Sequence, residues 1–354
     1  MSACICGNTF EQRDGKGRTR QHCSDACKQL DYRARKASKL RVTKLEDIRF
    51  YCGIGEKQWN HHPVTPGPYA CISPVYGKTE KKQSVNAVYV PQGTSIIQDS
   101  GAFSDGPSLR LSVEEALERQ IAHAEQFDYT HQITHRASYD LLIDEKWENG
   151  IRHKARWTEA DAELAVKLTV KAAAFLSAHR QDIPCILSAQ GVSAKQYLKC
   201  AEQVVPHLET QDLFGLGGWC VTGKFPAQIM PVFRETMHEV IPFLGREGVK
   251  HVHIWGVCYA PALGELLWLC NQHDIALSTD SMGPSIKPCM GAWGYASWRD
   301  NTYHQPSPDI RGLERARHVQ LTREWLADFR IREAKHYRSV WREKPHQLSL
   351  LEAV

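Results

Sequence analysis

The chain has 354 residues, of which 42% are hydrophobic and 24% are charged, a composition that is typical of globular proteins and excludes disorder of the whole chain. No apolar run approaches the ~20 residues needed to span a bilayer, and the N-terminus lacks an apolar signal-peptide core, so we expect a cytoplasmic protein that does not bind membranes. The net charge of +4 conceals a split. Residues 1–45 carry +7 and residues 311–344 carry +5, whereas residues 46–310 carry about −7. Two basic ends therefore flank an acidic body.

The first 40 residues form a predicted zinc-binding basic module. Two cysteine pairs, Cys4 with Cys6 and Cys23 with Cys27, have the spacing of a tetrahedral structural zinc site. So short a segment has too little apolar core to fold alone, and a bound metal would stabilise it. His22 is a substitute ligand, and four unrelated thiols in a flexible tail are the alternative. The positive charge suits a polyanion, although basic helix faces are often only solvated.

From residue 45 to 335, short apolar runs alternate with amphipathic segments. Strands are predicted at 48–54, 69–73, 86–90, 95–98, 139–144, 183–189, 212–217, 250–257 and 275–280. Helices are predicted at 113–127, 158–180, 193–205, 226–244 and 261–272. This alternation predicts an α/β fold with parallel strands, and about eight such units favour a (β/α)8 TIM-type barrel over a doubly wound sheet. A basic helix within 311–344 would close the barrel, and residues 336–354 form a C-terminal tail.

Polar residues and glycines follow six of the predicted strands, at the end where such barrels carry their chemistry. In chain order the segments are Asp99-Ser100-Gly101-Ala102-Phe103, Asp144, Gln190-Gly191, Gly217-Gly218, Trp255-Gly256-Val257 and Asp280. Carboxylates, an amide, aromatic rings and closely approaching glycines together suit a flat polar ligand.

In this order and spacing, the segments resemble the motifs of the tRNA-guanine transglycosylase family, over residues 90–285. Three features depart from the family pattern. Ala102 replaces a second glycine, Trp255 replaces a methionine, and only Cys289 follows Asp280 where the family has a zinc site. The chain is therefore most similar to the divergent branch that inserts 7-deazaguanines into DNA.

The resemblance implies catalytic roles for two carboxylates. Asp280 would attack C1′ of the sugar and form a covalent ester, and Asp99 would act as the general base toward the incoming base. The structural alternative is that each aspartate caps a helix after its strand.

The remaining motif residues would bind the base. Asp144 would accept hydrogen bonds from a guanine edge, while Gln190, Gly217 and Gly218 would donate to O6; Asp140 or Glu145 could take the place of Asp144. Phe103 and Trp255 would sandwich the ring, and Ser100, Gly101 and Gly256 complete the motifs. The alternatives are a loop carboxylate, a tight glycine turn and ordinary core aromatics.

We therefore expect a pentosyltransferase that replaces guanine in DNA with a 7-deazaguanine base, with structural Zn²⁺ and without ATP or a redox cofactor. The target base would have to be flipped out of the duplex, with helper proteins as candidate partners for opening it. Arg136, Arg152, Lys154 and Arg156 are either phosphate contacts or a solvated face. The rival functions are tRNA-guanine transglycosylation and zinc-dependent DNA binding by a protein whose barrel is inert.

Overall fold

The computed structural model describes residues 2–3, 9–10, 48–54, 68–75, 92–105, 110–143, 147–148, 151–152, 157–220, 222, 226–283, 295–297, 302–304, 331 and 334–335. The chain divides into two compact units, Met1–Lys44 and Leu45–Val354. In the first unit, β1 (Ser2–Ala3) pairs antiparallel with β2 (Thr9–Phe10). The four cysteines of the predicted zinc site lie outside the described residues.

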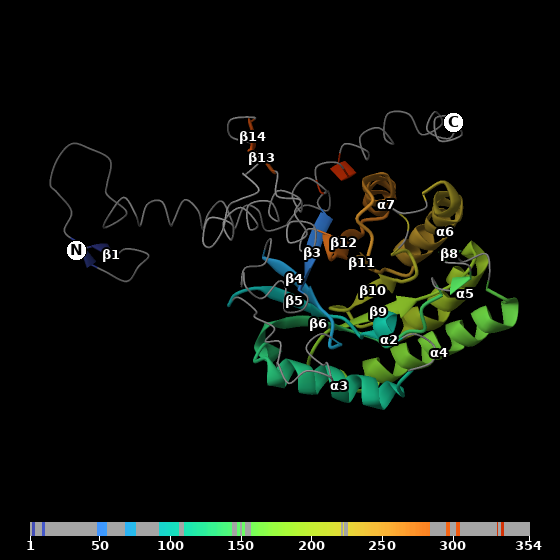
Figure 1. Ribbon diagram of the computed structural model, residues 1–354, viewed down its shortest axis with the longest axis horizontal. Helices are drawn as coiled ribbons and strands as arrows, with labels where there is room; N and C mark the ends of the chain where they lie inside the picture. Colours follow the sequence, from blue (N-terminus) through green and yellow to red (C-terminus); the bar gives the residue numbers. More distant parts are fainter. Residues whose placement is uncertain are drawn as a thin grey trace. The chain divides into compact units, whose positions relative to one another are not determined.

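The second unit contains eight parallel strands that close into a barrel (Figure 1). In chain order they are β3 (Ile48–Ile54), β4 (Tyr69–Ile72), β5 (Ser95–Gln98), β6 (Ile133–Ala137), β9 (Cys185–Ala189), β10 (Leu213–Leu216), β11 (His251–Ile254) and β12 (Ala276–Ser281). Each strand pairs with the next one along the chain, and β12 pairs with β3 to close the sheet. The predicted (β/α)8 barrel is confirmed, and the doubly wound alternative is wrong because an open sheet would leave two unpaired edges.

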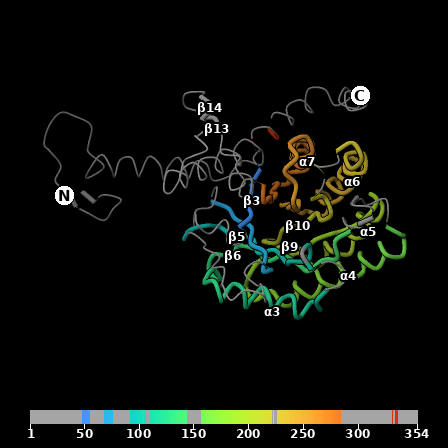
Figure 2. Tube along the Cα trace, viewed as in Figure 1, coloured from blue at the N-terminus to red at the C-terminus, as the bar shows by residue number. Residues whose placement is uncertain are grey.

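Helices surround this barrel, as the trace in Figure 2 shows. They are α2 (Ala102–Asp105), α3 (Val113–Gln126), α4 (Glu159–Ala178), α5 (Ala194–Val204), α6 (Pro226–Arg246) and α7 (Ala260–Gln272). Three of them begin where the sequence places a capping side chain: Ser112 accepts from the Glu115 N–H, Thr158 from the Asp161 N–H and Ser193 from the Gln196 N–H. These caps satisfy donors that the first helical turn cannot pair internally.

Short elements complete the described chain. The 3₁₀ turns η2 (Thr130–Gln132) and η4 (Val205–His207) precede β6 and follow α5. Two small antiparallel pairs join β7 (Trp147–Glu148) to β8 (Ile151–Arg152) and β13 (Tyr295–Ser297) to β14 (Thr302–His304). Within the described part of the chain, no helix is both long and apolar enough to span a membrane.

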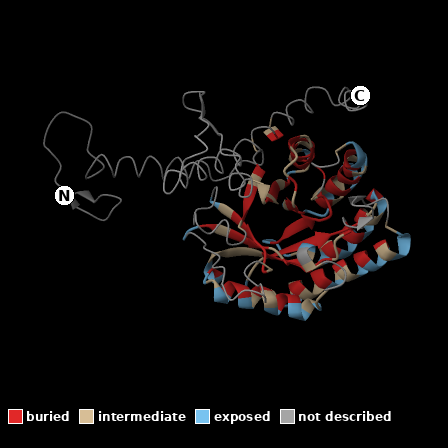
Figure 3. Ribbon diagram, viewed as in Figure 1, coloured by how far each residue is buried: buried red, intermediate tan, exposed pale blue. Residues whose placement is uncertain are grey.

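Most residues of the barrel strands are buried, as are residues on the helices that cover them (Figure 3). A large cluster fills the space between the strands and α4–α7, with Phe214, Phe233 and Leu266 fully buried. A smaller cluster fills the barrel interior and includes Tyr51, Ile97 and Trp255. The interior is therefore a packed core, and a ligand can reach it only from an end of the barrel.

One strand lies where the sequence did not predict it. Residues 139–144 were expected to form a strand because they are apolar, but residues 139–143 are an irregular segment after β6. β6 itself has the polar sequence Ile133-Thr-His-Arg-Ala137. Its Arg136 is only 2% exposed, and the guanidinium Nε donates to Gln98 Oε1 (3.0 Å). Pairing inside the fold thus allows a polar strand that single-sequence patterning misses, and it rules out both suggested surface roles for Arg136.

Three other expectations fall wholly or partly outside the described residues. The predicted strand at 86–90, Lys154 and Arg156 lie outside them. In the predicted helix 311–344, Ile331, Ala334 and Lys335 are helical. Ala334 is buried in the cluster between the strands and helices, which agrees with a helix packed on the barrel at this point.

Candidate functional site

Asp99 lies at the C-terminal end of β5, in a turn that leads into α2. The Ser100 N–H donates to Asp99 Oδ1 (2.8 Å), and Gly101 has a φ of +82°. A Cβ at Gly101 would also lie 2.6 Å from an Arg119 guanidinium nitrogen. Both the left-handed backbone and the close approach require glycine here, which gives a physical reason for the Asp-Ser-Gly motif.

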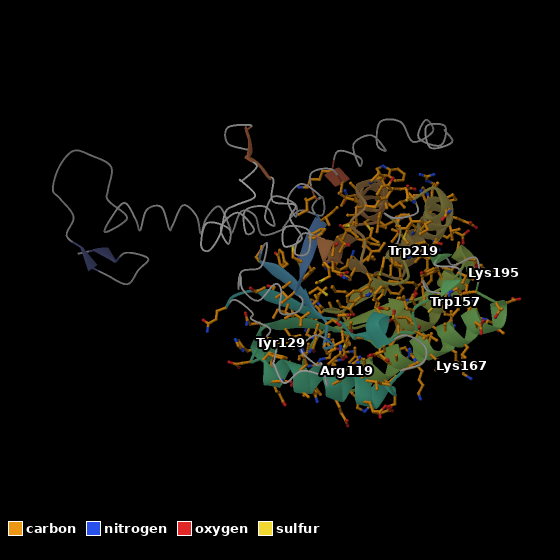
Figure 4. The ribbon with its side chains drawn as sticks, in the orientation of Figure 1. Arg119, Tyr129, Trp157, Lys167, Lys195 and Trp219 are labelled. Carbon is orange, nitrogen blue, oxygen red and sulfur yellow. The ribbon has the colours of Figure 1, made fainter. Side chains whose placement is uncertain are left out.

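Residues on α3 hold this turn in place. Arg119 (Figure 4) donates to the Ser100 carbonyl (2.7 Å) and to both oxygens of Asp105 (2.7 and 2.9 Å). Gln120 Nε2 donates to the Asp99 carbonyl (3.0 Å). Hydrogen bonds from α3 therefore fix the backbone that positions the Asp99 carboxylate. Neither α3 residue could be predicted from the sequence as part of the site, because a polar residue on a helix gives no sign of its partner.

Asp280 lies near the end of β12, on the partly exposed rim of the barrel. Its Oδ1 accepts a hydrogen bond from the Gly256 N–H (2.7 Å) and lies 3.4 Å from Nε2 of His253. Gly256 has a φ of +70°, a conformation that turns its N–H toward the carboxylate. The predicted Trp255-Gly256 segment is thus the hydrogen-bonding partner of the predicted nucleophile.

The two aspartates act on each other electrostatically. The pKa of Asp99 is raised from 3.8 to about 6, chiefly by burial and also by the negative charges of Asp280 and Asp140, while the nearby Ser73 hydroxyl and the hydrogen bond from the Ser100 N–H oppose the shift. Burial raises the pKa of Cys71 well above its usual value, and the charges of Asp280 and Asp99 raise it further. Cys71, on β4, is therefore within electrostatic reach of both carboxylates and stays a neutral thiol. The sequence gives no sign of this position, since Cys71 is one of several scattered cysteines.

A second polar group joins β6, β9 and β10. Gln190 Nε2 donates to Asp140 Oδ2 (2.5 Å), and Gln190 Oε1 accepts from the Ile143 N–H (3.4 Å). A Cβ at Gly217 would collide with Gln190 Nε2 and lie 3.0 Å from Asp140 Oδ2, so glycine leaves room for the pair. Asp140 occupies the position first expected for Asp144, which lies outside the described residues.

Burial raises the pKa of Asp140, whereas the hydrogen bond from Gln190 and the charge of Arg110 lower it. Arg110 also donates to the Asp140 carbonyl (2.9 Å), which links the backbone of this loop to the segment before α3. The Gly217 N–H donates to the Ala189 carbonyl (3.1 Å). That N–H is already engaged in the strand ladder, which argues against its expected bond to a guanine O6. Gly218 follows with a φ of +79°.

The two aromatic rings of the predicted sandwich have different environments. Phe103 is 46% exposed on α2, whereas Trp255 is 9% exposed and packs in the barrel interior. Trp255 Nε1 donates to Ser188 Oγ (3.0 Å), and its ring meets His253 edge-on at 4.3 Å between centroids. Among the described side chains, no ring contact joins Phe103 to Trp255. The orientation of the Trp255 indole is therefore fixed by its contacts, whereas Phe103 lies at the exposed rim of the barrel.

Two histidines and an arginine lie toward the opposite end of the barrel interior. His135 and His251 lie in β6 and β11, near Arg49 of β3. The pKa of His135 is lowered to about 4 and that of His251 to about 3, chiefly by burial and also by the charge of Arg49. Both imidazoles are therefore neutral near pH 7.

The described residues contain no group of three or more His, Cys, Asp or Glu side chains that could hold a metal ion. Their seven cysteines are all free thiols, five of them buried, as expected for scattered cysteines that pack as small apolar residues.

Comparison with known proteins leaves the activity open. The chain matches no protein-family model and no curated protein. Among solved structures, an L-ribulose 3-epimerase is similar at 12% identity and a TM-score of 0.36, covering 78% of this chain and 88% of that one. A GH5-4 broad specificity endoglucanase from an uncultured bacterium is similar at 10% identity and a TM-score of 0.36, covering 80% and 95%. Scores this low indicate neither common ancestry nor a shared activity, and the barrel assignment depends on the closed sheet itself.

Proposed function

We propose that the protein is a base-exchange transglycosylase, which replaces guanine in DNA with a 7-deazaguanine base through a covalent aspartyl–sugar intermediate. One observation supports this most: Asp99 and Asp280 both lie at the C-terminal end of the barrel, where the charge of Asp280 acts on Asp99, and within the described residues neither forms an ion pair with Lys or Arg. Two half-buried carboxylates without such a counter-ion are unfavourable, and glycosidic bond exchange is a reaction that uses such a pair.

The steps assign one task to each carboxylate. A carboxylate oxygen of Asp280 attacks C1′ as the C1′–N9 bond breaks, and guanine leaves with its bonding electrons and takes a proton from Asp99. The incoming base then gives its N9 proton to Asp99, and N9 attacks C1′, which releases the Asp280 carboxylate. A pKa of about 6 for Asp99 suits both directions of proton transfer near neutral pH.

Asp140 and Gln190 supply complementary groups for a guanine-like edge. A carboxylate accepts from N1–H and the 2-amino group, and a side-chain amide donates to O6. In the unliganded protein these two groups pair with each other at 2.5 Å, so neither is left unsatisfied until a base replaces the contact. Trp255, fixed by its bond to Ser188, offers an apolar face on which a base could stack.

DNA is the proposed polymer because of the basic ends. Residues 1–45, with a charge of +7, precede an acidic body that would itself repel a phosphate backbone. We propose that Cys4, Cys6, Cys23 and Cys27 hold a structural Zn²⁺, since four thiolates in two pairs suit that metal. The metal would order the module that grips DNA, while the target nucleotide is flipped into the barrel.

Incubation with radiolabelled guanine and either duplex DNA or tRNA tests the proposal. We expect label in DNA with the wild type and none with Asp280→Ala, whose DNA affinity should be unchanged. Label in tRNA alone would replace DNA by tRNA as the substrate. Binding of DNA with no exchange of guanine or any 7-deazaguanine would establish the DNA-binding rival instead.

The metal is tested separately by its content in the purified protein. We expect about one zinc per chain in the wild type, measured by elemental mass spectrometry, and loss of that zinc together with weaker DNA binding in Cys23→Ser. Cys71→Ser is the matched control, because Cys71 lies in the barrel. Equal zinc content in Cys23→Ser and the wild type would contradict the assignment.

A further inference from the structure

We infer that His253 is a positioning residue for Asp280: its Nε2–H holds Oδ1 of the carboxylate, and a hydrogen-bonded chain through Ser278 and His251 selects the tautomer that makes this possible. The inference rests on the proposed function, because it concerns the carboxylate assigned there as the nucleophile.

The geometry joins two neighbouring strands of the barrel. His253 lies in β11, fully buried, and Ser278 and Asp280 lie in the adjacent strand β12. His253 Nε2 lies 3.4 Å from Asp280 Oδ1, and in the unliganded protein it forms no hydrogen bond with Asp280 or with any other described residue. The contact is longer than an ordinary hydrogen bond, as is common for catalytic contacts that tighten when substrate binds.

The other ring nitrogen is held by a shared hydroxyl. Ser278 Oγ lies 2.9 Å from His253 Nδ1 and 3.0 Å from His251 Nε2. A serine hydroxyl has one proton to donate and two lone pairs to accept with. If His251 Nε2–H donates to Ser278, the hydroxyl can donate its one proton to His253 Nδ1 at 2.9 Å, a shorter contact than its alternative to the Val252 carbonyl at 3.4 Å. A proton on His253 Nε2 then faces Asp280.

The environment favours this arrangement over its reverse. The reverse tautomer would place the Nε2 lone pair 3.4 Å from a carboxylate oxygen, where both are electron-rich and neither has a proton to share. Burial and the charge of Arg49 lower the pKa of His251 to about 3, so His251 has only one N–H. That proton has an acceptor in Ser278 when it lies on Nε2, which starts the chain in the direction described.

The consequence is a distinction between the two oxygens of Asp280. Oδ1 would receive two donors, the Gly256 N–H at 2.7 Å and the His253 Nε2–H. Oδ2 accepts no hydrogen bond from any residue that the structure describes. The oxygen that attacks C1′ is therefore Oδ2, and the ring of His253 determines the direction in which it points. Trp255 packs edge-on against the same ring, which restricts its rotation.

Two substitutions at His253 distinguish the effect of its N–H donor from the effect of the ring's volume. His253→Phe keeps an aromatic filler but removes the donor, and His253→Gln retains an N–H near the position of Nε2. We measure single-turnover formation of the covalent protein–DNA adduct on denaturing gels, together with DNA affinity. We expect about a 10- to 100-fold slower rate for His253→Phe with unchanged affinity, and recovery of most of that rate in His253→Gln. His238→Phe is the matched control, since it removes another contact between histidine and carboxylate, that of His238 with Glu265 at 3.1 Å on α6 and α7.

A spectroscopic readout distinguishes failure of this inference from failure of the proposed function. In protein labelled with ¹⁵N-histidine, the resonances lost in His253→Gln identify His253, and their shifts report which nitrogen is protonated. We expect the Nε2–H form, and a shift of that resonance in Asp280→Asn. An Nδ1–H form, or adduct rates for His253→Phe equal to those of the wild type, would overturn the positioning role. A wild type that forms no adduct would overturn the proposed function, while the spectrum still decides whether His253 holds Asp280.

Discussion

Buried and half-buried carboxylates occur in two regions of this protein, and their surroundings differ. Asp212, before β10, pairs with Arg180 (3.1 Å) and also accepts from two backbone N–H groups, and Glu265 on α7 pairs with Arg234 (3.0 Å) and His238. We call these the paired carboxylates. Asp99, Asp140 and Asp280, the mouth carboxylates, form no Lys or Arg ion pair with any described residue.

The difference separates structural charge from chemical charge. An unpaired buried carboxylate is unfavourable for folding, and the raised pKa values of Asp99 and Asp140 express that cost. Arginine partners were available to the fold, since Arg110 and Arg119 bind carbonyl groups of Asp140 and Ser100 in the same loops. Keeping the mouth carboxylates without such partners leaves their oxygens free to bind or attack a ligand.

The largest expected effect concerns Asp280. Asp280→Asn removes the nucleophile while leaving a side chain of the same size, so exchange should fall by about 10³-fold or more. The measurement is incorporation of labelled guanine into DNA. The midpoint of thermal unfolding should change little, because no ion pair with Lys or Arg is lost. Exchange near the wild-type rate would show that Asp280 is not the nucleophile.

The opposite pattern is expected for a paired carboxylate. Asp212→Ala removes this partner of Arg180 and leaves the backbone N–H groups of Cys185 and Glu209 without their acceptor. The free energy of unfolding should therefore fall by about 3–5 kcal/mol. Urea denaturation measures this loss. The exchange rate of the folded fraction should stay near that of the wild type, and a selective loss of exchange with unchanged stability would erase the distinction between the two regions.

Asp140 should affect recognition of the base more than the chemical step. Asp140→Asn replaces an acceptor for N1–H and the 2-amino group with a group that also donates, so the KM for guanine should rise by about 10- to 100-fold. The rate at saturating guanine should change less. Steady-state kinetics with guanine as the varied substrate separate the two parameters, and an unchanged KM would remove Asp140 from the binding site.

The smallest effect is on stability, through Asp99. Its pKa in the folded protein, about 6, lies above the usual 3.8, so the folded state binds the proton more tightly and loses stability as pH rises between those values. Asp99→Asn should therefore be about 1–2 kcal/mol more stable than wild type at pH 8, with the gain vanishing near pH 4, although exchange is lost. Urea denaturation at both pH values measures it, and equal stabilities at pH 8 would contradict the unfavourable burial.

In the wild type, the raised pKa of Asp99 predicts how the rate of base exchange depends on pH. The general base must be ionised, so the rate with limiting incoming base should rise about tenfold per pH unit below about 6 and level off above it. The pH–rate profile of Gln190→Ala, which leaves the Asp99 turn intact, is the matched comparison. A profile that is flat from pH 5 to 8 would exclude Asp99 as the base.

Much of the fold could be predicted because it depends on local pattern. The helices 113–127 and 158–180 were predicted to within a few residues, since Ser112 and Thr158 cap them and their apolar faces repeat regularly. Most strands were predicted because both faces of a barrel strand are buried and read as apolar runs. β6 failed this test, because its polar side chains Thr134, His135 and Arg136 form hydrogen bonds with residues that lie far along the chain.

That single displacement also explains the uncertainty at the site. Placing the strand at 139–144 put Asp144 at its end, whereas the end of β6 at Ala137 brings Asp140 to Gln190. The partners of the site show the same limit. Cys71, Arg119, Ser278 and His253 are ordinary residues in sequence, and their importance comes from neighbours 14 or more positions away.

The sequence by itself determined the alternation of strands and helices, the two basic ends and the order of polar strand ends, because these depend on periodicity, charge and capping within a few residues. The tertiary structure decided which carboxylate meets Gln190, which charges raise the pKa of Asp99, and which histidine faces Asp280. Those relationships depend on which strands become neighbours when the sheet closes, and on how far burial weakens the solvation of a charge. Neither quantity exists until the barrel has formed.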